Sequence, residues 1–397
     1  MSRRLAAFLA AIMMLCLAAC GNAEQETPKE PIPETAEEPT PPPEPDPAEL
    51  AAQEIETLLA SMTLEEKVGQ LFFVRCPAEN AAEDAATYHL GGYILFARDF
   101  KDASGSWLTK EQVVENIASY QQAALNDTGI PLLIGADEEG GSVVRASRNP
   151  NLFENKFKSP QWLWNNQHDH GNVFAEDAWE KSNALLALGI NVNLAPVCDV
   201  STDPNDFIYD RTLGQDARAT AEYVTAVTTA MKDAGIGSVL KHFPGYGSNV
   251  DTHTGIALDE RPYETFASSD FLPFEAGINA GGTSTSVLVS HNIVTCMDAE
   301  LPASLSTEVH RILREKLDFH GVVMTDDLAM DAVSAYAGDG AVAVMSLQAG
   351  NDIVLTTDYR TQIPRVLEAV ENGSLEEELI NTACRRVLTW KQSLGMI

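Results

Sequence analysis

The sequence is poor in basic residues and in cysteine. Its 397 residues include 26 Lys and Arg against 58 Asp and Glu, a formal net charge of -32. An acidic surface of this kind repels nucleic acid and anionic lipid headgroups, so neither is expected as a partner. Beyond Cys16 and Cys20, cysteine occurs only at positions 76, 198, 296 and 384, without a CxxC pair or a histidine at metal-ligand spacing. We therefore expect free thiols, and neither a metal nor an organic cofactor.

Long hydrophobic runs are also lacking, and the one near the N-terminus is short. Arg3 and Arg4 precede an apolar run over residues 5–19, which is typical of an export signal and too short for a confident membrane span. The run closes with Leu-Ala-Ala-Cys at Cys20, similar to the lipobox at which bacterial lipoproteins are cleaved and acylated. We expect a lipoprotein signal peptide over 1–19, a lipid on Cys20 and an extracytoplasmic, membrane-anchored protein. The alternative is an ordinary secretory signal with an incidental cysteine.

Residues 20–48 contain almost no apolar residue able to seed a core. The segment is dense in Pro and Glu, so we expect a disordered, extended tether. At about 3.1 Å per residue, such a tether holds a domain several tens of ångströms from a membrane. No second linker divides the remainder, and residues 49–397 are therefore expected to form one domain, as a monomer.

This domain alternates short apolar runs with stretches long enough for a helix. The expected strands are 71–74, 92–96, 132–135, 192–195, 238–240, 286–289, 322–324 and 352–355. Continuous apolar strands are typical of a parallel sheet covered by helices. No GxGxxG or GxxxxGK[ST] motif follows the first strand, as an open nucleotide-binding sheet would favour. The sequence therefore predicts an α/β fold, a single (β/α)₈ TIM-type barrel.

Polar residues recur where the expected strands end, which is the active-site face of such a barrel. They are Asp137 after the third strand, Asp199 after the fourth, Lys241 and His242 after the fifth, His291 after the sixth, and Asp326 and Asp327 after the seventh. His291 has two possible roles, in the lining of a pocket or as a hydrogen-bonded core histidine.

The most specific stretch is Lys-His-Phe-Pro-Gly-Tyr-Gly at 241–247, followed by Asp-Thr-His at 251–253. It resembles the KHFPGxG…D[ST]H signature of family 3 glycoside hydrolases of the N-acetyl-β-glucosaminidase branch. Asp-Glu-Glu-Gly-Gly at 137–141 is similar to the family's DxEGG element, and Thr-Asp-Asp-Leu-Ala-Met at 325–330 to its nucleophile motif. Many members of the branch have histidine where this chain has Tyr246, which puts the geometry of that loop in doubt. The resemblance covers essentially the whole domain.

The resemblance implies roles for individual residues. Asp326 is implied as the nucleophile, and Asp251 with His253 as an acid/base pair. Retaining glycoside hydrolysis needs these two functions, a carboxylate that attacks the anomeric carbon and a group that protonates the leaving oxygen. Side chains alternate along a strand, so Asp327 cannot point at the same substrate atom, and we expect it to cap the following helix or supply a supporting charge. The residues implied in binding sugar hydroxyls are Asp137, Arg145, Arg211, Lys241 and His242.

The expected activity is removal of terminal β-linked N-acetylglucosamine from peptidoglycan fragments or chitooligosaccharides. Three alternatives stay open at this point. Phosphate could replace water as the acceptor on the same fold, or the chain could be a sugar-binding lipoprotein without turnover. A metal-dependent barrel hydrolase is a third alternative, although no HxH or HExxH spacing supports it. Arg145 and Lys241 could also serve only in internal salt bridges.

Overall fold

The computed structural model describes residues 46–249, 257–330, 333, 336 and 342–397 of the chain. The predicted signal peptide, the tether up to residue 45, and the predicted acid/base residues Asp251 and His253 lie outside the described residues. The chain divides into two units, residues 1–45 and residues 46–397. Every helix and strand of the described residues belongs to the second unit.

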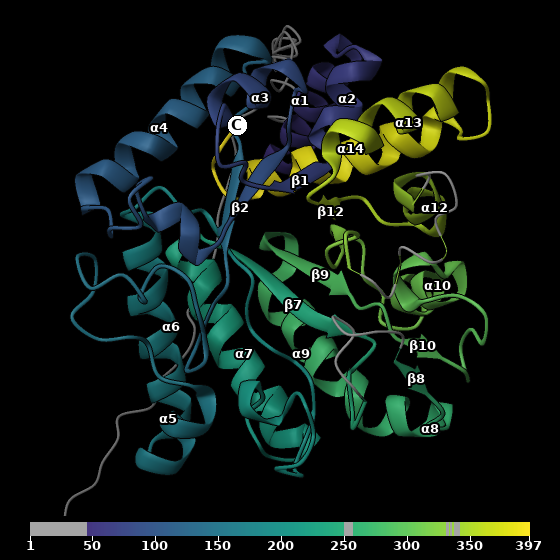
Figure 1. Ribbon diagram of the computed structural model, residues 1–397. Helices are drawn as coiled ribbons and strands as arrows, with labels where there is room; N and C mark the ends of the chain where they lie inside the picture. Colours follow the sequence, from purple (N-terminus) through teal and green to yellow (C-terminus); the bar gives the residue numbers. More distant parts are fainter. Residues whose placement is uncertain (1–45, 250–256, 331–332, 334–335, 337–341) are drawn as a thin grey trace, which may run out of the picture. The chain divides into compact units, whose positions relative to one another are not determined.

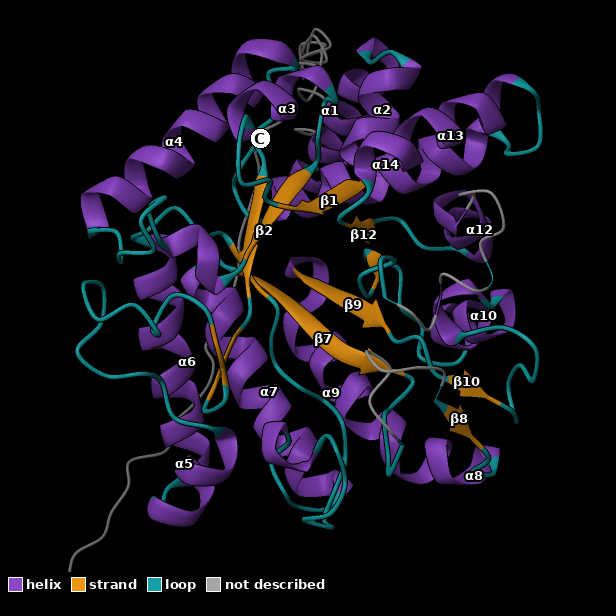
Figure 2. Ribbon diagram, in the orientation of Figure 1, coloured by secondary structure: helices purple, strands orange, loops and turns teal. Residues whose placement is uncertain are grey.

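Eight parallel strands form a single sheet that curls into a barrel, with helices on its outer side (Figures 1 and 2). The strands are β1 (Phe72–Arg75), β2 (Gly92–Leu95), β3 (Leu133–Ala136), β6 (Val192–Asn193), β7 (Gly237–Phe243), β9 (Thr285–Val289), β11 (Val323–Thr325) and β12 (Val354–Thr356). Their order in the sheet is β11-β9-β7-β6-β3-β2-β1-β12. A parallel bridge between Met324 and Ile353 joins β11 to β12 and closes the ring. The predicted (β/α)₈ barrel is confirmed.

Helices cover the outer face of the barrel (Figure 1). The larger ones are α1 (Pro47–Ser61), α2 (Leu64–Gln70), α3 (Ala81–Thr87), α4 (Lys110–Asp127), α5 (Pro160–Asn166), α6 (His170–Leu186), α7 (Ala217–Ala234), α9 (Phe271–Gly281), α10 (Thr307–Glu315), α12 (Val342–Ala349), α13 (Tyr359–Glu371) and α14 (Glu377–Ser393). The short helix α8 (Tyr263–Thr265) lies beside two short strands, β8 (Leu258–Asp259) and β10 (Ile293–Val294) (Figure 2). Thr63 begins α2 with a capping box, in which the side chains of Thr63 and Glu66 each accept from the other's backbone N–H.

The barrel interior is filled by side chains rather than open. Phe73 on β1 is fully buried, and its ring occupies the space beside two glycines on neighbouring strands. A Cβ atom at Gly92 would lie 2.7 Å from Phe73 Cδ2, and one at Gly135 would lie 2.5 Å from Phe73 Cζ. The glycines on β2 and β3 leave room for the large ring on β1. Burial of that ring contributes about 1.5–3 kcal/mol to the stability of the fold.

Two strands differ from their predicted bounds in ways that shape the site. The regular ladder of the fourth barrel strand ends at Asn193, two residues early, because the Ala195 N–H donates back to the Asn193 oxygen at 2.8 Å. The fifth strand, β7, extends to Phe243, so Lys241 and His242 lie within it and not after it. The register of β7 against β9 shifts between Leu240 and Phe243. This irregularity interrupts the alternation of side chains and lets Lys241 and His242 face the same cavity.

The cysteines of the described region are unpaired. Cys76, Cys198 and Cys384 are buried and Cys296 is exposed, and all four are free thiols, as predicted. No helix in the described part of the chain is long and apolar enough to cross a membrane.

Candidate active site

A cavity of about 530 Å³ opens at the carboxyl ends of the barrel strands. Its volume lies within the roughly 300–1,000 Å³ that is usual for small-ligand sites. Six residues that the sequence predicts for the site line it, namely Asp137, Arg145, Arg211, Lys241, His242 and Asp326. Hydrophobic side chains complete the wall, among them Phe96, Phe207 and Met330. The fold therefore brings together side chains that lie up to 189 positions apart in the sequence.

A charge network joins five residues, Arg145, Asp137, Lys241, Glu139 and Arg211, and all of them except Glu139 line one side of this cavity. Lys241 Nζ lies 2.7 Å from Asp137 Oδ1 and 2.7 Å from Glu139 Oε1. Arg145 Nη2 lies 3.2 Å from Asp137 Oδ2, and Arg211 forms a two-pronged pair with Glu139 at 3.0 and 2.7 Å. The network joins three cations to two carboxylates, which leaves one excess positive charge.

Mutual pairing keeps the carboxylates and the lysine of this charge network ionised. Burial by itself would raise the pKa of Asp137, but Lys241 and Arg145 hold it below its ordinary value. Burial also acts to raise the pKa of Glu139, and Arg211 and Lys241 bring it far below the usual range. For Lys241, burial acts to lower the pKa, and the two carboxylates raise it above normal. Fixed charges of this kind suit the binding of sugar hydroxyls, which both donate and accept.

His242 is held in place by two charged neighbours, Asp199 and Arg211. Nδ1 lies 2.7 Å from Asp199 Oδ2, while Nε2 lies 3.1 Å from Arg211 Nη2. Because a guanidinium only donates, Nε2 must accept, and the single ring proton belongs on Nδ1, where it is donated to Asp199. Asp199 also accepts the backbone N–H of His242 at 3.2 Å and that of Tyr246 at 2.7 Å. These contacts fix the orientation of the His242 ring at the edge of the cavity.

Tyr246, which departs from the family signature, is buried beside His242. The two rings meet edge to face, with centroids 5.5 Å apart, and Phe207 packs on the Tyr246 ring at 5.9 Å. The Tyr246 ring thus packs between Phe207 and His242.

Glu138 organises the loop that carries Arg145. Its Oε2 accepts from three consecutive backbone N–H groups, Arg145 at 3.0 Å, Ala146 at 2.9 Å and Ser147 at 3.3 Å. The Ser147 hydroxyl donates to Oε1. Burial raises the pKa of Glu138, against these hydrogen bonds. The carboxylate thereby fixes the short hairpin of β4 (Glu138–Gly140) and β5 (Val143–Val144), and with it the start of the Arg145 side chain.

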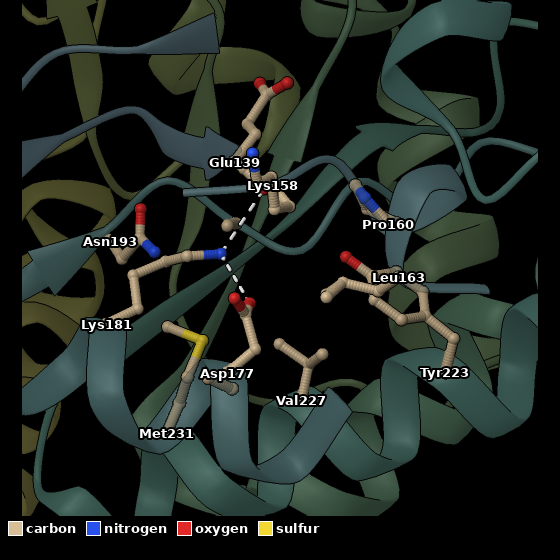
Figure 3. A pocket seen from close by; sticks show the side chains of 12 residues that line it. Glu139, Lys158, Pro160, Leu163, Asp177, Lys181, Asn193, Tyr223, Val227 and Met231 are labelled. Atoms are coloured by element: carbon tan, nitrogen blue, oxygen red, sulfur yellow. Dashed lines mark hydrogen bonds and ion pairs between the residues drawn. The ribbon is translucent and has the colours of Figure 1, made fainter. Parts of the chain in front are cut away.

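A second, enclosed cavity lies behind Glu139, between β6 and helices α5, α6 and α7 (Figure 3). Its volume is only about 10 Å³, too little for a sugar ring. Lys181 reaches into it from α6, 3.0 Å from Asp177 Oδ2 and 3.4 Å from the backbone oxygen of Glu139. Lys181 therefore holds the strand that carries Glu139 from outside the barrel wall.

Asp326 and Asp327 lie together at the end of β11 and have different partners. Asp326 Oδ1 accepts the backbone N–H of Asp327 at 2.8 Å, and both side chains line the cavity. Asp327 is engaged by the following turn, since it accepts from Ala329 N at 3.0 Å and from Thr357 Oγ1 at 3.2 Å. Burial, together with the charge of Asp326, raises the pKa of Asp327. These contacts match the supporting role that we expect for Asp327.

Of the two roles open for His291, the structure favours the core histidine. Its Nδ1 lies 2.7 Å from Ser304 Oγ and its Nε2 lies 3.1 Å from the backbone oxygen of Asp327. The ring is fully buried and supports the backbone behind Asp326.

Nowhere in the described part of the chain do three or more His, Cys, Asp or Glu side chains come together in a way that could hold a metal ion.

Sequence reasoning gives no role to Glu139, and it places Asp199 on the active-site face without naming its partner. Glu139 binds both Lys241 and Arg211, and Asp199 fixes His242. The signals for them are the second acidic position of the 137–141 element and the place of Asp199 after the fourth strand. Neither signal says which cation the carboxylate meets, because the partners lie 43 to 102 positions away.

A parallel barrel of this kind carries its active site at the carboxyl ends of its strands, where the charge network and Asp326 lie. Comparison with known proteins specifies the family. Residues 63–390 match the model described as "Glycosyl hydrolase family 3 N terminal domain". The chain belongs to glycosyl hydrolase family 3.

Relatives of similar length have the same kind of name. A "Beta-hexosaminidase" of Xylella fastidiosa (strain M12) is 33% identical over 273 residues, which cover 67% of this chain and 76% of the relative. One of Stenotrophomonas maltophilia is 31% identical over 319 residues, covering 77% and 86%. With these relatives and this fold, the chain is a glycoside hydrolase of the β-N-acetylhexosaminidase type.

Solved structures agree with this assignment. A family 3 β-N-acetylglucosaminidase from Paenibacillus sp. str. FPU-7 is 31% identical with a TM-score of 0.76, over 85% of this chain and 63% of that one. The chain thus spans less than two thirds of the Paenibacillus structure. A β-N-acetylhexosaminidase from Beutenbergia cavernae is 30% identical with a TM-score of 0.72, over 84% of this chain and 99% of that one.

Proposed function

We propose that the protein is a retaining exo-β-N-acetylglucosaminidase, which removes terminal β-linked N-acetylglucosamine from peptidoglycan fragments or chitooligosaccharides. One observation carries the proposal: Asp326 shares a single cavity with Arg145, Asp137, Lys241 and Arg211, the four members of the charge network that line it, and Glu139 holds Lys241 and Arg211 in place. The network offers fixed donors and acceptors to the hydroxyls of one sugar ring, and Asp326 offers a carboxylate at the end of a rigid strand.

The reaction proceeds in two displacements. In the first, an Asp326 oxygen attacks the anomeric carbon, the bond to the leaving oxygen breaks, and His253 gives a proton to that oxygen. In the second, a water molecule attacks the same carbon, gives its proton to His253, and the ester bond to Asp326 breaks. Asp251 lies two positions before His253, and its carboxylate orients the ring and stabilises the charged form.

The test is turnover of p-nitrophenyl N-acetyl-β-glucosaminide and of chitobiose by the protein, by Asp326→Ala and by His253→Ala. We expect Asp326→Ala to lose activity on both substrates by on the order of 10⁴-fold or more. His253→Ala should lose more on chitobiose, because p-nitrophenolate leaves without being protonated. Equal losses on the two substrates would contradict His253 as the acid.

The same assay with and without phosphate separates the remaining alternatives. Phosphorolysis stays open because a histidine acid/base avoids placing a second carboxylate beside an anionic acceptor. Formation of N-acetylglucosamine 1-phosphate only when phosphate is present would assign it. Binding of N-acetylglucosamine without any turnover by the intact protein would assign a sugar-binding lipoprotein instead.

For the location of the protein, we propose a lipid anchor on Cys20 and an extracytoplasmic barrel held by the tether of residues 20–48. The support is the sequence pattern of residues 3–21. Metabolic labelling with a fatty acid tests it: the protein should be labelled and partition with membranes, while Cys20→Ser should be unlabelled. Label on the Cys20→Ser variant would contradict the anchor.

A further inference from the structure

Arg75 is a cation of the cavity that the charge network does not include. It is the last residue of β1, and its side chain lines the cavity. The centre of its guanidinium lies 4.4 Å from the centroid of the Phe96 ring, and that of Arg145 lies 5.2 Å from the same ring. Two guanidinium groups thus converge on one aromatic side chain of the cavity wall.

The two arginines differ in their partners. Arg145 pairs with Asp137, whereas Arg75 makes no side-chain hydrogen bond or ion pair with any residue in the described ranges. The Nε atoms of both side chains are buried without a hydrogen-bond partner among the described residues. The charge of Arg75 acts to lower the pKa of Asp99, against the larger effect of burial, but Asp99 forms its ion pair with Arg98, at 3.3 Å.

An unpaired cavity cation is unexpected in a chain of this composition. Acidic residues outnumber basic ones by 58 to 26, and carboxylates already pair with the other cations of the cavity, Arg145, Arg211 and Lys241. The fold therefore leaves one guanidinium facing the space where the substrate binds. A guanidinium recognises planar or tetrahedral oxyanions through two parallel N–H···O bonds, better than it recognises a single hydroxyl.

We propose that Arg75, beside Phe96 and Arg145, binds an anionic substituent of the saccharide, a carboxylate or a sulfate, and so determines specificity among β-N-acetylglucosaminides. This inference rests on the proposed function and adds the charge of the substrate to it. The anionic group has two possible sources, the terminal sugar itself or the sugar that leaves.

Two matched pairs of substrates distinguish these sources. For the terminal sugar, the pair is p-nitrophenyl N-acetyl-β-glucosaminide with and without a 6-sulfate. For the leaving sugar, the pair is chitobiose and N-acetylglucosaminyl-β-1,4-N-acetylmuramic acid, which differ by a carboxylate-bearing substituent. The quantity compared is the ratio of kcat/KM between the anionic and the neutral member of each pair.

We expect Arg75→Gln to lower this ratio at least about tenfold in one of the two pairs, mainly through KM, and Arg75→Lys to restore part of it. The matched control is Lys101→Gln, because Lys101 lies 4.4 Å from the Trp107 ring and is exposed outside the cavity. Lys101→Gln should keep the wild-type ratio in both pairs. Thermal unfolding of each variant verifies the fold.

Unchanged ratios in Arg75→Gln, with all four substrates losing the same factor or none, would overturn the proposal and leave Arg75 a shape-giving residue. Failure of the proposed function is a separate result. If the wild-type protein turns over none of the four substrates, calorimetric binding of methyl N-acetylglucosaminide with and without a 6-sulfate, and of the two disaccharides, decides instead. The anionic member must then bind more tightly in one pair, and Arg75→Gln must abolish the difference.

Discussion

The two ends of the barrel bury a lysine in opposite ways. At the carboxyl end, Lys241 Nζ lies 2.7 Å from Asp137 and 2.7 Å from Glu139, and its pKa is raised above normal despite burial. At the amino end, Lys391 Nζ lies 2.6 Å from Gln70 Oε1 and 2.7 Å from the backbone oxygen of Pro131. These acceptors are neutral, and burial lowers the pKa of Lys391 to about 7.

The difference separates a functional use of buried charge from a structural one. Lys241 faces the cavity in which we propose that the substrate binds, and its two carboxylate partners keep it charged there. Lys391 only needs to satisfy two carbonyl oxygens that precede β1 and β3, which a neutral amine also does. Of these two buried lysines, only the one at the active end of the barrel is paired with carboxylates.

The largest effect should come from Lys241→Met. The change removes the cation that Asp137 and Glu139 share and leaves each carboxylate with one arginine, so we expect about 1.5–3 kcal/mol less stability. It also removes a donor to the substrate, and kcat/KM should fall by about 10²-fold or more. Urea unfolding and the chromogenic assay measure the two losses. Lys391→Met is the matched control, and a comparable loss of kcat/KM in that variant would erase the distinction between the two ends.

The next effect concerns the Glu138 carboxylate, which orders the Arg145 loop. Glu138→Ala removes the acceptor of three backbone N–H groups, so stability should fall by about 1–3 kcal/mol. Because Arg145 is then held less firmly, KM should rise by about tenfold with a smaller change in kcat. Glu138→Gln keeps one acceptor oxygen and should lose less in both quantities. A fall in kcat at unchanged KM would show that Glu138 acts on another step.

Lys391 should make the stability of the protein depend on pH. Its folded-state pKa of about 7 lies below the usual value near ~10.4. The unfolded chain therefore binds the extra proton between these values, and stability rises with pH across this window. From pH 7 to 9, the wild-type protein should gain about 1–2 kcal/mol relative to Lys391→Met. Denaturant unfolding at the two pH values measures it; equal slopes for both proteins would mean that Lys391 stays charged.

The smallest effect should come from Asp327→Asn. The amide keeps an oxygen for the Ala329 N–H, so we expect less than about 1 kcal/mol of lost stability and a roughly threefold or smaller fall in kcat. Asp326→Asn in parallel should lose nearly all turnover. Similar losses in the two variants, followed with the chromogenic substrate, would overturn the assignment of the nucleophile to the first of the pair.

The sequence predicts the barrel well because short apolar runs and their spacing report burial directly. Five predicted binding residues and Asp326 lie in one cavity, as predicted, because the strand ends of a parallel barrel converge. Pairings are harder to predict. The roles of Glu139 and Asp199 depend on which distant side chain each one binds. The place of Lys241 and His242 within β7 depends on a register shift that apolar periodicity does not encode.

The most direct test of the proposed mechanism is to trap the covalent intermediate. The protein is incubated with 5-fluoro-N-acetylglucosaminyl fluoride, whose glycosyl ester hydrolyses slowly, and its peptides are then analysed by mass spectrometry. We predict one added fluorosugar on the peptide that contains Asp326, attached to Asp326 and not to Asp327. A modified residue other than Asp326, or steady release of sugar without any adduct, would contradict the mechanism.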